Sequence, residues 1–86
     1  MKVRLPTPLV EYTDGIREVE AVGDSLDALL RDLDRRYPGI RFRMIDEQGQ
    51  VRAHIKLFVN AELQRSLATP LNANDDILIV AALSGG

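Results

Sequence analysis

The strongest constraint in this sequence is one stripe of apolar residues with the spacing of an amphipathic helix. Apolar side chains stand at positions i, i+3, i+4, i+7 and i+11 of a single stretch: Leu26, Leu29, Leu30, Leu33 and Tyr37. This spacing places them on one helix face. Asp24 or Ser25 can cap the start, and Pro38-Gly39 ends the helix. Because an 86-residue chain forms one domain with one compact core, the stripe must pack against a second layer of the same domain.

Short segments on both sides of the helix predict that this second layer is a β-sheet. Polar and apolar residues alternate over residues 2–5, 17–21 and 54–59, which is the period of a half-buried strand. Residues 77–81 contain no polar side chain. This last pattern indicates a central strand that is either covered on both faces or flanked by paired strands.

The predicted order of elements is β-β-α-β-β, with residues 2–22 forming an antiparallel β-loop-β unit. One helix on one face of a mixed sheet is the two-layer α+β solution. If the first and last strands are central neighbours, they run parallel, because a helix-bearing crossover joins them. This is the ubiquitin-like β-grasp arrangement, with four to five strands packed on one main helix. We expect a β-grasp domain over residues 1–82 and a flexible C-terminal tail over residues 83–86.

Two further groups of residues carry expectations about the core and the surface. The mixed stretch after the helix offers three apolar anchors: Ile40, Phe42 and Ile45. The helix contains two acid-before-base pairs at i,i+4 spacing, which we expect on its solvent-exposed side: Asp27 with Arg31, and Asp32 with Arg36.

Composition excludes several classes of function. The chain has 11 Lys and Arg residues against 13 Asp and Glu, for a net charge of −2, whereas nucleic-acid binding predicts a basic excess. It has no run of about 18 apolar residues that could span a membrane. It has no cysteine, and therefore no disulfide and no thiolate nucleophile or metal ligand. We expect a cytoplasmic protein.

The sequence offers little from which to build a catalytic or metal site, so we do not expect an enzyme. Its one histidine, His54, precedes Ile55 in an alternating strand and is interpreted as a surface residue. Asp75-Asp76 could be read as a carboxylate pair, but a solvated turn that starts the last strand accounts for it better. No phosphate-binding glycine loop is present.

The end of the sequence is harder to explain by folding alone. After the last predicted strand the chain reads Leu83-Ser84-Gly85-Gly86. Glycines cost ordering entropy and add no core contact, although a frayed end would also look like this. Two glycines suit a tail that must enter a narrow channel in another protein, because they leave the backbone and the α-carboxylate sterically bare.

Several short motifs match a known family in order and spacing across nearly the whole chain. They are Arg17-Glu-Val-Glu20, Gly23-Asp-Ser-Leu26, Arg36-Tyr-Pro-Gly39, Leu57-Phe-Val-Asn60, Thr69-Pro-Leu71 and Leu83-Ser-Gly-Gly86. Together with the β-grasp pattern, they make the sequence resemble the ubiquitin-like sulfur carriers of the MoaD/ThiS family. The chain departs from the family where proline is often found, at Ala81, and where glycine is often found, at Ala61 and Asn74.

The resemblance implies a carrier rather than a catalyst. It implies that an E1-like enzyme adenylates the carboxylate of Gly86 with ATP, and that sulfur then displaces AMP to leave a thiocarboxylate. Gly85 would give access, while Leu83 and Ser84 would span the channel mouth. The ATP would belong to the partner, and a second partner, a biosynthetic enzyme, would accept the sulfur for cysteine, molybdopterin or a related product.

The partner surface is expected on the sheet face opposite the helix. Phe58 alternates away from Ile55, Leu57 and Val59 and is the best candidate anchor there. Burial of Phe58 beneath residues 40–53 is the alternative, because alternation does not reveal loop cover. Three other functions stay open: a protein modifier that forms isopeptides through Gly86, the small subunit of molybdopterin synthase, and a non-covalent β-grasp adaptor.

Overall fold

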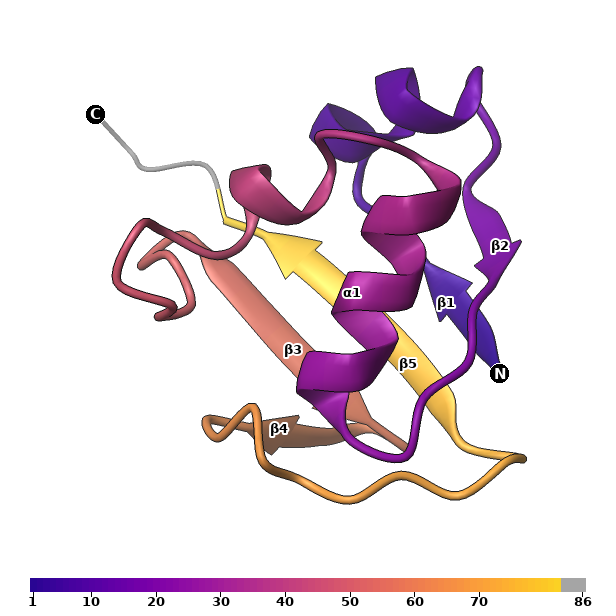
Figure 1. The fold of residues 1–86 in the computed structure, drawn as a ribbon. Helices are drawn as coiled ribbons and strands as arrows, with labels where there is room; N and C mark the ends of the chain where they lie inside the picture. The colour runs from indigo at the N-terminus through magenta and orange to yellow at the C-terminus, as the bar shows by residue number, and fades with distance from the viewer. Residues whose placement is uncertain (83–86) are drawn as a thin grey trace.

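The helix predicted from the leucine spacing lies across one face of a five-stranded sheet (Figure 1). The computed structural model describes residues 1–82 of the chain. Its elements are β1 (Lys2–Arg4), the 3₁₀ helix η1 (Thr7–Thr13), β2 (Glu18–Glu20), α1 (Leu26–Arg36), the 3₁₀ helix η2 (Arg41–Arg43), β3 (Ile55–Val59), β4 (Glu62–Gln64) and β5 (Asp76–Ala81).

The sheet has the strand order β2-β1-β5-β3-β4. β1 and β5 run parallel, with Val3 beside Ile77, and the other neighbours are antiparallel. The predicted α+β β-grasp fold, with its first and last strands paired, is confirmed. β4, which no sequence pattern singled out, joins β3 through Asn60 and Ala61, at φ values of 50° and 71°. Two consecutive residues with positive φ are typical of a tight hairpin turn, and at Ala61 that conformation normally favours glycine.

The core lies between α1 and the sheet face that it covers. Leu26, Leu29, Leu30 and Leu33 of α1 are fully buried, and they face the inward residues of the central strands: Val3, Ile55, Leu57, Ile77 and Ile79. The helical stripe is therefore a core face. Of the two explanations for the apolar run in β5, flanking by paired strands is right and cover on both faces is wrong, because Leu78 is 40% exposed.

The start of α1 depends on a close approach of two backbone segments. The Ser25 side chain caps the helix by accepting a hydrogen bond from the Ala28 N–H at 3.2 Å. Just before it, a Cβ added to Gly23 would lie 2.4 Å from the Leu29 backbone nitrogen. Only glycine lets the chain enter the helix along this path.

One of the three residues predicted as apolar anchors after α1 is not buried. Ile40 and Ile45 are buried as predicted, but Phe42 is 55% exposed and is not a core anchor. Phe42 lies in η2, whose turn of about three residues differs from the helical and strand periods. Its ring packs instead against the Arg52 guanidinium, whose Cζ lies 4.8 Å from the ring centroid.

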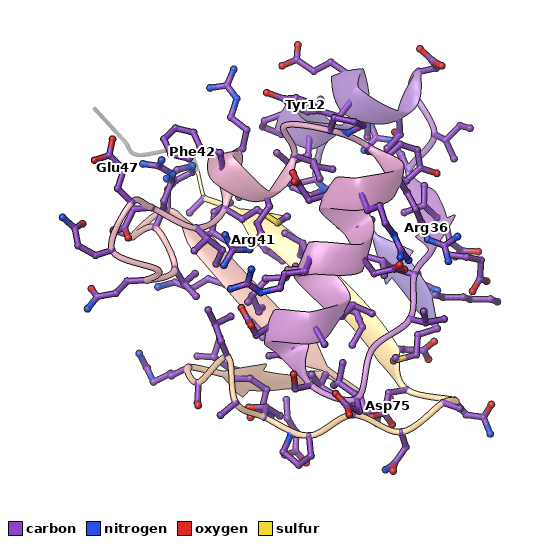
Figure 2. The ribbon with its side chains drawn as sticks, in the orientation of Figure 1. Tyr12, Arg36, Arg41, Phe42, Glu47 and Asp75 are labelled. Carbon is purple, nitrogen blue, oxygen red and sulfur yellow. The ribbon has the colours of Figure 1, made fainter. Side chains whose placement is uncertain are left out.

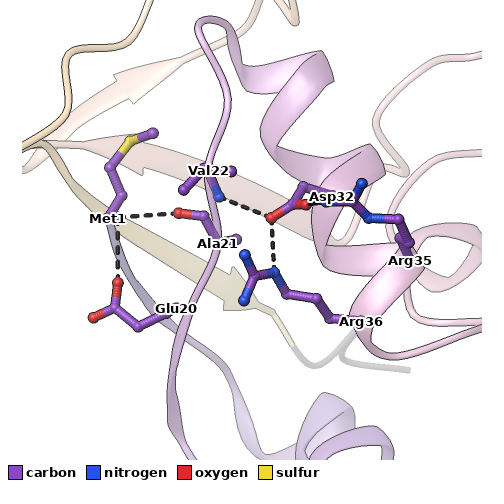
Figure 3. A network of polar contacts seen from close by, with 7 residues as sticks. All are labelled: Met1, Glu20, Ala21, Val22, Asp32, Arg35 and Arg36. Atoms are coloured by element: carbon purple, nitrogen blue, oxygen red, sulfur yellow. Dashed lines mark hydrogen bonds and ion pairs between the residues drawn. The ribbon is translucent and has the colours of Figure 1, made fainter.

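The predicted position of the Asp32 side chain was also wrong (Figure 3). The pairing of Asp32 with Arg36 is confirmed, but the Asp32 side chain is buried rather than on the solvent-exposed side. It accepts hydrogen bonds from the Val22 backbone N–H at 2.9 Å and from Arg36 Nε at 2.8 Å, and it also pairs with Arg35. Val22 lies beyond β2, so Asp32 supplies the acceptor that a strand partner would otherwise provide. It fastens the helix to the β2–α1 loop.

Replacing Asp32 by alanine should lower the free energy of unfolding by about 1–3 kcal/mol at pH 7, because the Val22 N–H loses its acceptor. The Val22 N–H, with help from Arg36 and Arg35, holds the pKa of Asp32 below its ordinary value of 3.8. A lowered pKa means that this stabilisation is present above pH 3.8 and is lost as the pH falls through the folded-state pKa.

Urea unfolding of wild type and Asp32→Ala at pH 7 and below pH 3.8 measures both effects. Glu47→Ala, which removes an exposed carboxylate, is the control and should change stability little. A stability difference that stays constant as the pH falls would show that the Asp32 charge is not what fastens the loop.

Candidate functional site

The C-terminal tail begins at the end of the central strand. β5 ends at Ala81, and the Ala82 N–H donates a hydrogen bond to the His54 carbonyl at 2.7 Å. This point lies at the opposite end of β5 from Asp76, which pairs with Lys2. The four residues predicted to do the chemistry or to give access to it, Leu83, Ser84, Gly85 and Gly86, lie outside the described residues. The pairing of β5 and the Ala82 hydrogen bond fix the point at which the described chain ends.

The sheet face turned away from α1, here called the open face, carries a row of side chains across all five strands. Paired residues lie on the same face, and the register places them in the order Glu18, Arg4, Leu78, Phe58 and Leu63. Leu63 and Leu78 are each 40% exposed, and Phe58 between them is half-buried. Large exposed apolar side chains that lie side by side are typical of an interaction surface.

The prediction that Phe58 lies on the sheet face opposite the helix is therefore confirmed. Phe58 does not belong to the core cluster, whose members from β3 are Ile55, Leu57 and Val59, so the alternative of a core position is wrong. Its role in binding a partner stays a prediction.

Cationic side chains border the apolar part of the open face. Arg4 and Lys2 on β1 share Glu18, at 3.5 Å and 4.0 Å, and Lys56 on β3 is exposed beside Val80. A shallow hollow of about 400 Å³ lies between β1, β5 and the β3–β4 turn. An apolar centre with a charged rim has the anatomy of a protein–protein interface.

The residues weighed for catalysis have structural roles or are exposed. His54 is exposed, and its carbonyl holds Ala82. Asp75 closes a turn by accepting from the Asn72 N–H at 2.7 Å and from Asn60 Nδ2 at 2.9 Å, and the Asn72 N–H above all holds the pKa of Asp75 below its ordinary value. Within residues 1–82 no group of His, Cys, Asp or Glu is placed to hold a metal ion. None of the helices in this range has the length and apolar character needed to cross a membrane.

Sequence reasoning missed a second surface, at the end of β5. A hollow of about 430 Å³ is lined there by Ala81 and by residues from η1, η2 and the segment before β3. We call its polar and aromatic part the collar, which consists of Glu11, Phe42, Arg43, Arg52 and His54. Figure 2 shows Phe42 on the side of the molecule where the described chain ends. The available signal was the tripeptide Arg41-Phe42-Arg43, in which two cations flank a bulky apolar residue.

Comparison with known proteins agrees with the fold. The sequence matches the ThiS family model over residues 3–86. It is 36% identical to the sulfur carrier protein CysO of Mycobacterium tuberculosis over 98% of this chain and 96% of that protein. The crystal structure of that CysO superposes with a TM-score of 0.90 at 34% identity, covering 95% of this chain and 98% of the other.

Two other solved structures resemble the chain over nearly its whole length. The complex of BexX and CysO from Amycolatopsis orientalis contains a chain with a TM-score of 0.90 and 30% identity, covering 99% of this chain and 98% of that one. SAMP1 of Haloferax volcanii has a TM-score of 0.80 and 27% identity, with coverages of 100% and 98%. The chain is therefore a member of the ThiS family, a small ubiquitin-like sulfur carrier rather than an enzyme.

Proposed function

We propose that this protein carries sulfur as a thiocarboxylate on Gly86 and delivers it to a biosynthetic enzyme. The observation that carries the proposal is the Gly85-Gly86 end of the sequence, which is separated by three residues from a central strand in a chain of the ThiS family. β5 has a strand partner on each side, so the point from which residues 83–86 continue is fixed relative to the surfaces of the domain.

The chemistry needs a partner that activates the carboxylate. A C-terminal carboxylate has a pKa of about 3.3–3.7 and is an anion and a poor electrophile at neutral pH. In the proposed first step an oxygen of the Gly86 carboxylate attacks the α-phosphorus of ATP on an E1-like enzyme, and pyrophosphate leaves. Sulfide, as HS⁻, then attacks the acyl carbon, the bond to AMP breaks with AMP as the leaving group, and the proton lost from sulfur leaves a thiocarboxylate on Gly86.

The residues of this chain supply access and docking in this scheme. Gly85 lets the backbone pass a narrow channel, and Leu83 and Ser84 span the channel mouth. Phe58 anchors the open face on the partner. The chain itself holds no cofactor in the proposal. ATP belongs to the activating enzyme, and the reaction takes place where ATP is available, in the cytoplasm.

Cysteine biosynthesis is the pathway that we propose. The support is the similarity to the sulfur carrier protein CysO over 98% of the chain. The solved complex of another CysO with BexX supports the expectation that this chain also docks on partner proteins.

A protein modifier is the second candidate function, because SAMP1, whose name stands for small archaeal modifier protein 1, has the same fold. The two functions differ in the acceptor of the activated Gly86 carbonyl, which is sulfur in one and a lysine amine in the other. Conjugates of higher mass in cell extract, lost when Gly86 is deleted, would favour the modifier.

Deleting Gly86, or Gly85 and Gly86 together, should abolish the transfer of radiolabelled sulfide to the protein in the presence of the E1-like enzyme and ATP. The carboxylate of the shortened chain would no longer reach the adenylation centre. The melting temperature should stay close to that of wild type, because a terminal segment outside the core contributes little buried surface. Full sulfur transfer to the truncated chain would mean that the terminal carboxylate is not the working group, and the adaptor function would then take its place.

Replacing Phe58 by alanine should raise the KM of the activating enzyme for the carrier about 5- to 30-fold, which corresponds to about 1–2 kcal/mol of docking energy. The kcat should hold, because the tail keeps its chemistry. Ile16→Ala, which truncates an apolar side chain of 54% exposure outside the open face, is the matched control. Equal KM values for the two variants would show that Phe58 does not contribute to docking on the activating enzyme.

A further inference from the structure

Phe42 is a second exposed aromatic residue, and it lies on a different surface from Phe58. It belongs to η2, which packs near α1, whereas Phe58 is on the open face. Its side chain has no place in the core and is 55% exposed. An exposed aromatic side chain beside the end of β5 is a candidate docking anchor, since aromatic residues and arginine are enriched at interfaces.

Arg52 holds Phe42 in a defined position by two contacts. Its guanidinium lies over the ring, with Cζ 4.8 Å from the centroid, and its Nε donates a hydrogen bond to the Phe42 carbonyl at 2.9 Å. The stack and the hydrogen bond fix the backbone and the ring together. A partner would therefore meet a preorganised surface, which lowers the entropy cost of docking.

Arg52 also lacks a charge partner in the part of the chain that the structure describes. Arg43, its neighbour in the collar, has Glu11 at 3.9 Å and the Tyr12 hydroxyl at 2.7 Å, whereas no carboxylate of residues 1–82 lies within ion-pair distance of Arg52. A planar guanidinium that is already oriented on an aromatic ring suits a carboxylate from another protein.

The length of the tail decides which protein covers the collar. The segment from Leu83 to Gly86 is four residues long and can reach at most about 14 Å beyond Ala82. A protein that encloses Gly86 in a channel must therefore come close to the surface around the end of β5. Ala81, at that end, lines the same hollow as Phe42, Arg43 and Arg52.

We propose that the collar is a second docking surface for the activating enzyme, with Phe42 packed against the mouth of the channel that takes the tail and Arg52 paired with a carboxylate on the rim of that mouth. The inference rests on the proposed function and adds to it. The open face sets which protein binds, and the collar fixes the direction from which the tail enters.

The test measures pyrophosphate release by the E1-like enzyme and ATP as a function of the concentration of the full 86-residue chain. Phe42→Ala and Arg52→Gln should each raise the KM about tenfold, with kcat within about twofold of wild type. Phe42→Tyr, which keeps the ring, should restore the wild-type KM. The double variant should raise the KM by less than the product of the two single effects, because the two side chains act as one unit. The KM of Arg52→Gln should also depend less on salt than that of wild type.

Val22→Ala is the matched control. Val22 is 55% exposed, as Phe42 is, but it follows Ala21, which is hydrogen-bonded to Met1 at the Asp76 end of β5, opposite the collar. Its KM should equal that of wild type. If wild type is adenylated and both collar variants keep its KM, the collar is not a docking surface and the proposed function stands. If the E1-like enzyme releases no pyrophosphate in the presence of the wild-type chain, the proposed function is wrong, and so is the proposed role of the collar.

Discussion

β1 and β5 lie side by side in the middle of the sheet and run in the same direction, although they come from opposite ends of the chain. A parallel pair requires a crossover on one face of the sheet, and α1 is part of that crossover. Its leucines bury the inner face of both strands. The same pairing makes β5 a central strand, so that the tail leaves the domain from a strand with neighbours on both sides.

In this architecture, the surfaces that stabilise the fold are separate from those that remain exposed. Stability resides on the inner face of the sheet and in the Asp32 contact that fastens α1 to the loop before it. The open face and the collar contribute little to the core, and each carries an aromatic residue that is at least partly exposed. This division suits the proposed function, in which the protein docks on other proteins and reacts through the Gly86 carboxylate alone.

The elements that follow from local periodicity could be predicted from the sequence. The helix, the three strands with alternating residues and the orientation of Phe58 all depend on which residues share a face, and spacing reports that directly. The fourth predicted strand, β5, could be recognised from its apolar run. Phe42 could not be placed, because a short 3₁₀ turn follows neither the helical nor the strand period. Asp32 could not be placed on the correct side either, because its burial depends on the Val22 N–H, which only the tertiary fold brings close. β4 is short and needs the positive φ of Ala61, which the residue type does not favour.

Intact mass spectrometry can show whether the carboxylate of Gly86 is the working group, as we propose. The chain is incubated with the E1-like enzyme, ATP and a sulfur donor, and its mass is compared with that of a sample without ATP. Replacement of one carboxylate oxygen by sulfur adds about 16 Da, and fragmentation should assign the added mass to Gly86. An unchanged mass, or an added mass assigned to any other residue, would show that Gly86 does not carry the sulfur.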